Sequence, residues 1–462
     1  MSRFFAIFSL LPLVACATQH CSGKNKRPQA TATKSETPTK DKPAPKPPKA
    51  GPNEQATLYP MQGNAGASHC RVEAKTAVAA LSDETFAVKV TQVKNQLLVA
   101  WTTRAERDQV HARWYHWPRQ PQSNAPLRAS SPAFAFAMPT RPFIDFELSS
   151  RHGKALIISG NTGRNRHFMH LSTLIPAQTE PRQQVHNYRL PGMAIISVAR
   201  IPARHIKGRW QRDAPLHLWT QASNGLYGGH IIRIEAADNE NAPRIETLAE
   251  TGGINDAWVD ERGKVYMIES DEEKASLRIL DPKATSKAER TKSYPLQGLG
   301  GRQRGDTLVG TYAIAGQASD TDPATMQLVL ATMRIDNGGL DTPGPYELHE
   351  YGKVRGWRNY DLKGRAQGPI HPIQTSQDLP MPWRKQVYLR YHGKAKRLRR
   401  KDFLGRVVGE SLPIAIAPER STTRRSSMWS LGRGVGFTWT GHTWAIAVWD
   451  GLELQLHRVN CR

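Results

Sequence analysis

Several features that mark common enzyme classes are missing from this sequence. It contains no Gly-x-Ser-x-Gly elbow, no Gly-x4-Gly-Lys-[Ser/Thr] loop and no His-Glu-x-x-His motif. Its four cysteines show no metal-type spacing, and no internal stretch approaches the roughly 18 consecutive apolar residues of a spanning helix. These absences, with 462 residues and a mean hydropathy of −0.56, predict a large soluble globular body without a cofactor or a metal site.

Acidic residues are scarce relative to basic ones. The sequence has 64 Lys and Arg against 40 Asp and Glu, which gives a formal net charge of +24 and a pI of about 10.1. A field of this sign attracts polyanions. The densest basic run predicts a cationic hairpin as a candidate binding site, made of Lys394, Lys396, Arg397, Arg399, Arg400 and Lys401. The alternative is a solvated hairpin without a ligand.

The N-terminus carries a targeting signal. Arg3 precedes the apolar run 4–15, which has signal-peptide length. The run ends in Leu13-Val14-Ala15-Cys16, which resembles the lipobox of bacterial lipoproteins. The resemblance implies that residues 1–15 are a signal peptide and that Cys16 becomes an acylated N-terminus, carrying diacylglycerol and palmitate. The other reading is a plain secretory peptide with an unmodified Cys16.

The lipobox resemblance also implies a cellular location. In that family an Asp after the Cys usually retains the protein at the inner membrane, whereas Ala17 stands here, so the outer membrane is the expected destination. Residues 16–57 are rich in Lys, Pro, Thr and Ala, and between positions 22 and 56 no apolar side chain except proline is larger than Ala. Such a segment cannot bury enough surface to offset the entropy of ordering. We therefore expect a disordered tether.

The body, 58–462, reads as a repeat of short strands. Apolar runs of four to eight residues recur, several of them apolar on both faces, which requires cover on both sides of a sheet. The stretch 143–158 aligns with 254–268, with Asp145 and Asp256 at equivalent positions and a Gly-containing turn in each. Another hairpin lies between them, so the period is about 55 residues. Further hairpins at this period predict about seven units.

This period and strand pattern resemble the β-propeller architecture. We expect an all-β propeller of about seven blades, with a pair of β-sandwiches or a β-helix as the alternatives. To close the ring, 71–77 would form the outer strand of the last blade beside 452–459. A disulfide between Cys70 and Cys461 would then tie the two ends of the domain, which an exported protein can keep.

Polar residues near the first strand of several units are a second candidate site. If those strands line a central channel, the residues ring its mouth, where propellers commonly form pockets. They are Arg141, Asp145, Asn255, Asp256, Arg304 and Asp306. Two carboxylates there could act as acid and base in a glycosidase or lyase. The structural alternative is that each Asp caps a turn or pairs with a neighbouring blade.

Together these features predict an exported, lipid-anchored protein that acts as a non-catalytic binding scaffold at the cell envelope. Its expected partners are the membrane, through the anchor, and an anionic envelope polymer or a protein. Nucleic acid is not the expected partner, because an exported chain meets envelope polyanions first. The alternative function is a carbohydrate-active enzyme that uses the channel-mouth carboxylates.

Overall fold

The computed structural model describes residues 60–61 and, with gaps, 69–461. The gaps are 82–84, 104, 107, 119–124, 138–145, 164–165, 189–194, 202–214, 223–228, 236–243, 252–253, 271–273, 305–306, 320, 337–351, 382, 386, 393–396 and 418–433. The chain divides into two units, Met1–Ala50 and Gly51–Arg462, and every described residue belongs to the second. The predicted signal peptide, Cys16 and most of the predicted tether lie outside the described residues.

Strands dominate the described residues and form antiparallel sheets, which confirms the all-β prediction. The first sheet consists of β3 (Thr85–Val93), β4 (Gln96–Thr103), β5 (Gln109–His116) and β6 (Phe134–Ala137). The second has β7 (Phe146–Arg151), β8 (Lys154–Gly163), β9 (Arg166–Leu174) and β10 (Arg182–Tyr188). The third has β11 (Ile195–Arg200), β12 (Leu216–Ala222), β13 (Gly229–Glu235) and β14 (Arg244–Thr251). The fourth has β15 (Ile254–Val259), β16 (Val265–Ser270), β17 (Ala275–Leu280) and β18 (Thr291–Pro295).

Three further sheets complete the described part of the unit. The fifth contains β19 (Gly300–Arg304), β20 (Thr307–Ala318), β21 (Thr325–Asp336), β22 (Gly352–Asp361) and β23 (Ala366–Pro372). The sixth pairs β24 (Val387–His392) with β25 (Arg397–Asp402) and with β1 (Pro60–Met61). The last has the order β2 (Cys70–Ala80), β28 (Glu453–Cys461), β27 (Trp444–Trp449) and β26 (Val435–Trp439). The helical segments are α1 (Lys287–Arg290) and two 3₁₀ turns, Ser376–Asp378 and Trp383–Lys385, and none of them could cross a membrane.

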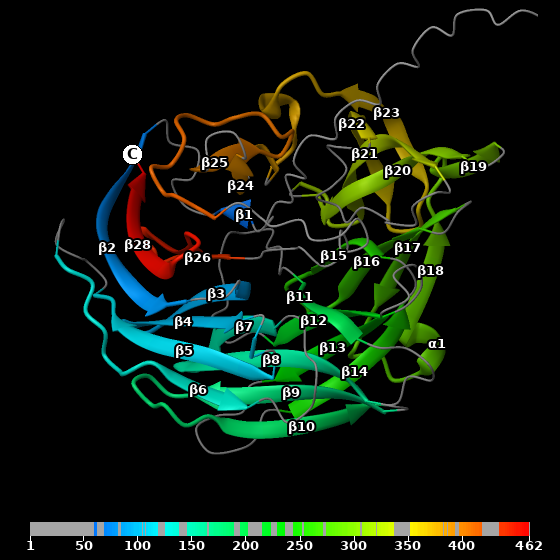
Figure 1. Ribbon diagram of the computed structural model, residues 1–462. Helices are drawn as coiled ribbons and strands as arrows, with labels where there is room; N and C mark the ends of the chain where they lie inside the picture. The colour runs from blue at the N-terminus through cyan, green and yellow to red at the C-terminus, as the bar shows by residue number, and fades with distance from the viewer. Residues whose placement is uncertain are drawn as a thin grey trace, which may run out of the picture. The chain divides into compact units, whose positions relative to one another are not determined.

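Apolar clusters join each sheet to the next. One cluster packs β4 and β5 against β7 and β8, and equivalent clusters connect the second sheet to the third, the third to the fourth and the fourth to the fifth. The fifth packs on Leu379, Trp383 and Phe403, which flank the sixth sheet, and the sixth packs on the last. The last sheet in turn packs on the first. The sheets therefore follow one another in a propeller-like arrangement (Figure 1).

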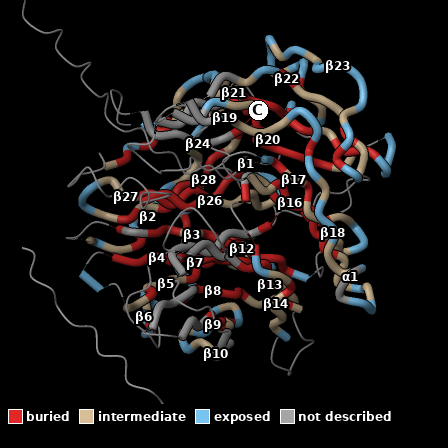
Figure 2. The backbone as a smooth tube through the Cα atoms, turned by 90° about the vertical axis from the view of Figure 1, so that its right-hand side faces the viewer, coloured by how far each residue is buried: buried red, intermediate tan, exposed pale blue. Residues whose placement is uncertain are grey.

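Strands that are apolar on both faces occupy the middle of the sheets, as the sequence pattern predicts. β4 is buried from Leu97 onward and β27 from Trp444 to Val448. Figure 2 shows buried backbone through β3, β4 and β8, and exposed backbone along β18, α1 and β23. Six of the twelve tryptophans fill this core and are among the largest fully buried side chains. At roughly 25 cal/mol per Å² of apolar area, these inter-sheet layers are the main source of stability.

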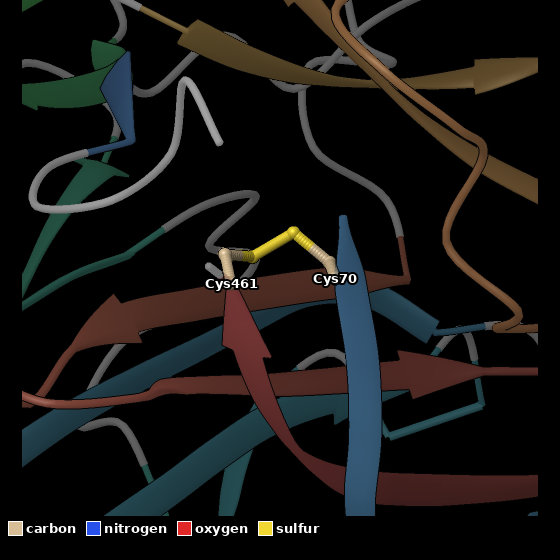
Figure 3. Close-up of a disulfide and its surroundings, with 2 residues drawn as sticks. All are labelled: Cys70 and Cys461. Atoms are coloured by element: carbon tan, nitrogen blue, oxygen red, sulfur yellow. A yellow bond between two sulfur atoms is a disulfide. The ribbon is translucent and has the colours of Figure 1, made fainter. Parts of the chain in front are cut away.

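The two ends of the unit meet in one sheet. β2 is its outer strand and pairs antiparallel with β28 from Cys70↔Cys461 to Ala80↔Glu453. Cys70 and Cys461 form a disulfide across this pair, with their Cα atoms 4.1 Å apart (Figure 3). The prediction of the outer strand, the closing pair and the disulfide is confirmed.

The repeat of about 55 residues predicts a sixth unit over 356–401, with 386–391 as its one clear strand, and the start of this unit is wrong. Residues 356–361 lie in β22 and pair with β21 of the fifth sheet. Among the described residues the sixth sheet consists of β24 and β25, and the N-terminal β1 pairs at its edge at Pro60↔Tyr388 and Met61↔Val387. The pairing of β1 with β24 leaves no periodic signal in the sequence, because β1 has two residues and lies far from β24 along the chain.

A turn with one sequence pattern recurs three times. It runs Asp-x-x-Gly-Lys/Arg and starts at Asp260, Asp361 and Asp402. In each turn the Asp Oδ1 accepts hydrogen bonds from the backbone N–H groups two and four residues later. The Gly has a positive φ of 76° to 83°, a conformation that side chains other than Gly adopt at a cost. The carboxylate thus satisfies turn amides that the ladder leaves unpaired.

We predict that two of these glycines differ in their tolerance of alanine. Gly263→Ala should cost about 1 kcal/mol of unfolding free energy, because a Cβ there meets nothing within 4 Å and only the left-handed φ is strained. Gly364→Ala should cost about twice as much or more, because its Cβ would lie 2.2 Å from the Pro295 carbonyl oxygen. Urea unfolding of both variants measures the difference, and equal losses would contradict the steric argument.

We also predict that the disulfide is a major contributor to stability. Its cysteines are 391 positions apart, so reduction frees a very long loop in the unfolded chain, which corresponds to about 6 kcal/mol in the chain-entropy model. Cys70→Ser with Cys461→Ser should lower the unfolding free energy by that order, measured in guanidinium without reductant. Cys21→Ser serves as the matched control and should change nothing; two free thiols at Cys70 and Cys461 in the native protein would contradict the pairing.

Candidate functional site

The channel-mouth candidates are represented in the described structure mainly by Asp256. It follows a β-bulge near the start of β15. Its Oδ1 accepts the N–H of Ala257 at 2.9 Å, and its Oδ2 accepts the N–H of Gly316 in β20 at 2.8 Å. The carboxylate therefore ties the fourth sheet to the fifth. This is the structural role that the sequence allows as the alternative to catalysis.

The close approach at Gly316 explains why that bond can form. A Cβ at Gly316 would lie 2.6 Å from the Trp258 ring and 2.7 Å from the Ile268 side chain. Only glycine lets β20 lie this near to β15. The sequence alignment identified Asp256 from its repeat position, but its partner was not visible because Gly316 is remote in sequence.

The other members of this candidate set are not brought together in the described structure. Arg141, Asp145 and Asp306 lie outside the described residues. Asn255 and Arg304 lie on β15 and β19, and only their backbone positions are described. A pair of carboxylates at the spacing that a glycosidase needs stays a prediction.

The basic hairpin is formed by β24 and β25, but its charges do not all face solvent. Along β25 exposure alternates, so Arg397 is exposed, Arg399 and Lys401 are half-buried, and Arg400 is fully buried. The Arg399 Nε donates to the Ser411 Oγ at 3.1 Å, and burial lowers the pKa of Arg400. Arg400 is thus not available to a polyanion on the surface. Lys394 and Lys396 lie outside the described residues.

The reason for the inward Arg400 is the strand register. Arg400 stands opposite Leu389, and Leu398 stands opposite Tyr391. Leu389 and Leu398 belong to the apolar cluster between the sixth and last sheets, so period-2 alternation places Arg400 on the same face. Six of the eight residues from 394 to 401 are basic. The sequence therefore does not show which of these basic side chains point into the core.

A second buried arginine lies in the last sheet. Arg458 of β28 is 1% exposed, and its guanidinium carbon lies 4.9 Å from the centre of the Trp117 ring. Its Nη1 donates to the Ala125 carbonyl at 3.3 Å, and burial, the largest cause, lowers its pKa. The contact links the last sheet to the loop that follows β5. No sequence signal distinguished this arginine from surface ones.

The histidines form no metal site among the described residues. No group of three or more His, Cys, Asp or Glu side chains there could hold a metal ion. His111 is paired with Glu106, with Nε2 and Oε2 2.6 Å apart, and it stacks on Trp101 with ring centres 5.6 Å apart. Asp322 lies in a turn and accepts hydrogen bonds from the Ala324 N–H and the Thr325 hydroxyl.

Two histidines are buried in the sheets and stay neutral to low pH. Burial, with the nearby Arg233 as the next cause, lowers the pKa of His217 to about 4. Burial, followed by Lys75 on the paired strand, lowers the pKa of His457 to about 4. Within the described structure neither ring nitrogen of His457 has a hydrogen-bond partner. Both residues therefore fit packing better than proton transfer near neutral pH.

We predict that these histidines make the fold acid-sensitive. An unfolded histidine titrates near pH 6.5, so between about pH 6.5 and 4 the unfolded chain binds more protons, and lowering the pH destabilises the fold. Each histidine should remove about 1.4 kcal/mol of unfolding free energy per pH unit in that window and nothing above it. Chemical unfolding of His457→Leu at pH 7.5, 6, 5 and 4.5 should show a shallower loss than the parent; an unchanged slope would contradict the assignment.

Comparisons with known proteins give no family. No protein-family model and no curated protein match the chain. Among solved structures, Sqt1 of Chaetomium thermophilum bound to the N-terminus of ribosomal protein L10 is 13% identical, with a TM-score of 0.38 over 85% of this chain and 100% of that chain. The WD40 domain of Toxoplasma gondii coronin is 10% identical, with a TM-score of 0.38 over 88% of each chain. The polysaccharide lyase Uly1 is 9% identical, with a TM-score of 0.36 over 88% of this chain and 98% of that chain. At these values none of them assigns a ligand or an activity to this chain.

Proposed function

We propose that this protein is an exported, lipid-anchored scaffold that binds an anionic component of the cell envelope without catalysis. The observation that carries the proposal is the Cys70–Cys461 disulfide across the β2–β28 pair. Disulfides persist in oxidising compartments and are rare in the cytosol. A structural disulfide therefore supports export, which is also what the lipobox-like run before Cys16 implies.

The proposed body is a closed propeller of seven blades. Two features support it: the described strands form seven sheets, and the apolar clusters lead from each sheet to the next and from the last back to the first. Radial repetition of this kind covers both faces of each sheet and leaves only short sheet edges. A rigid body on a long tether suits a scaffold, because the tether sets the reach while the body presents a fixed surface.

The binding reading is favoured over the enzyme reading by Asp256. Both of its carboxylate oxygens accept backbone N–H bonds, one of them across the sheet interface. A carboxylate whose two oxygens are both engaged with the backbone has a structural role, which leaves it less free to act on a substrate. The net charge of +24 indicates a polyanionic ligand.

The anchoring part of the proposal is tested by substitution of single cysteines. Full-length chains carrying Cys16→Ser or Cys21→Ser are expressed in a bacterium, labelled with palmitate and separated into soluble, inner-membrane and outer-membrane fractions. The parent and Cys21→Ser should take up label and sediment with the outer membrane. Cys16→Ser should lose both properties, because an acyl anchor contributes roughly 0.8 kcal/mol per buried CH₂. Retention of label by Cys16→Ser would overturn the assignment.

A further inference from the structure

The fifth sheet carries an extension at one end. β20 and β21 have 12 residues each, about twice the length of the strands in the fourth sheet. The extension consists of β19 with 307–311 of β20, 332–336 of β21 and 352–355 of β22. Figure 1 places β19 at the periphery. β19 can lie against β20 because Gly310 has no side chain, since a Cβ there would be 2.3 Å from the Gly300 carbonyl oxygen.

Strand register divides the extension into two faces. Directly opposite residues share a face of the sheet, and successive residues alternate. One face holds apolar positions of β20, β21 and β22, namely Leu308, Tyr312, Ala331, Met333, Ile335 and Val354. Tyr312, Ala331 and Val354 pack in the cluster next to the sixth sheet. This face therefore belongs to the core side.

The opposite face, which we call the cationic face, collects basic residues from three strands, β19, β21 and β22. Arg302 is opposite Val309, and Val309 is opposite Arg334. Arg304 lies two residues further along β19, and Lys353 is opposite Thr332. Arg355 joins this face, because its Nη1 donates to the Thr311 Oγ1 at 3.1 Å. Asp336 is the single acidic residue at these register positions.

The part of this face with described side chains is open to solvent. Arg302 and Arg355 are exposed, and Val309 between the charged positions is 36% exposed. Arg302 and Arg304 are about 7 Å apart along the strand, and Arg302 and Arg334 are about 10 Å apart across β20. Several cations at this spacing repel one another unless a polyanion bridges them.

We propose that the cationic face binds a phosphate-bearing saccharide polymer. Guanidinium groups make paired hydrogen bonds to phosphate oxygens, and each phosphate monoester brings more charge and more acceptor oxygens than a carboxylate. Val309 offers the apolar contact that a sugar ring can use. The cationic face would determine which class of ligand the envelope scaffold binds. This inference rests on the proposed function only for the place in the cell where the ligand is met.

The binding is measured with the full-length protein and soluble phosphomannan across a salt series. The variant is Arg302→Gln, Arg304→Gln and Arg355→Gln together. The matched control, Arg262→Gln, Lys283→Gln and Lys292→Gln, removes the same charge from exposed positions elsewhere. The variant should bind at least about tenfold more weakly and reduce the slope of log affinity against log salt by about 2–3, whereas the control should stay within about twofold. Thr311→Val removes the Arg355 hydrogen bond but keeps the charge, and it should bind like the parent.

Four outcomes overturn the proposal. They are equal binding of phosphate-free mannan, equally tight binding of polygalacturonate, equally tight binding of duplex DNA, and an equal loss in the control variant. The first three outcomes would identify the ligand as a neutral sugar, an acidic polysaccharide or a nucleic acid, respectively. The fourth would show that binding depends on the overall positive charge of the protein and not on the cationic face. Because this binding does not need Cys16, loss of the anchoring result would leave it standing, and the reverse also holds.

Discussion

The pairing of β2 with β28 is the interaction on which the rest of the structure depends. It joins residues from the two ends of the unit in one ladder, and the Cys70–Cys461 disulfide locks the end of that ladder. Without it the last sheet would lose its outer strand, which contributes Val78 to the apolar layer shared with the first sheet. The contact between the last and the first sheet matters because several strands are apolar on both faces and need a neighbour on both sides.

The contacts between sheets also explain where polar residues stand. Asp256 bonds to the Gly316 backbone across an interface, and Arg458 lies on the Trp117 ring across another. Buried polar groups of this kind are tolerated only with partners, so they fix the register of one sheet on the next. Residues that the sequence suggests as a functional site can therefore have a structural role instead. In the extension of the fifth sheet, by contrast, Arg302 and Arg355 are exposed to solvent.

Much of the fold was predictable from local pattern. The hairpins β3–β4, β15–β16, β20–β21 and β26–β27, the outer strand β2 and the disulfide followed from strand periodicity, turn residues and cysteine positions. The Asp-x-x-Gly-Lys/Arg turns are a further repeat signal that is visible in the sequence. The sites were predicted less well, since a run of basic residues does not say which of them point inward. Arg400 turns into the core because Leu389 and Leu398 set the face.

By itself the sequence determined the all-β class, the repeat of hairpins and the residues that join the two ends, because these depend on period-2 alternation and on short-range turn chemistry. Only the tertiary structure decided that β22 belongs to the fifth sheet, that β1 borders the sixth, and that Arg302, Val309 and Arg355 share one face. Such placements depend on the register between strands and on which sheet covers which. Those are properties of contacts between distant segments, and no local pattern encodes them.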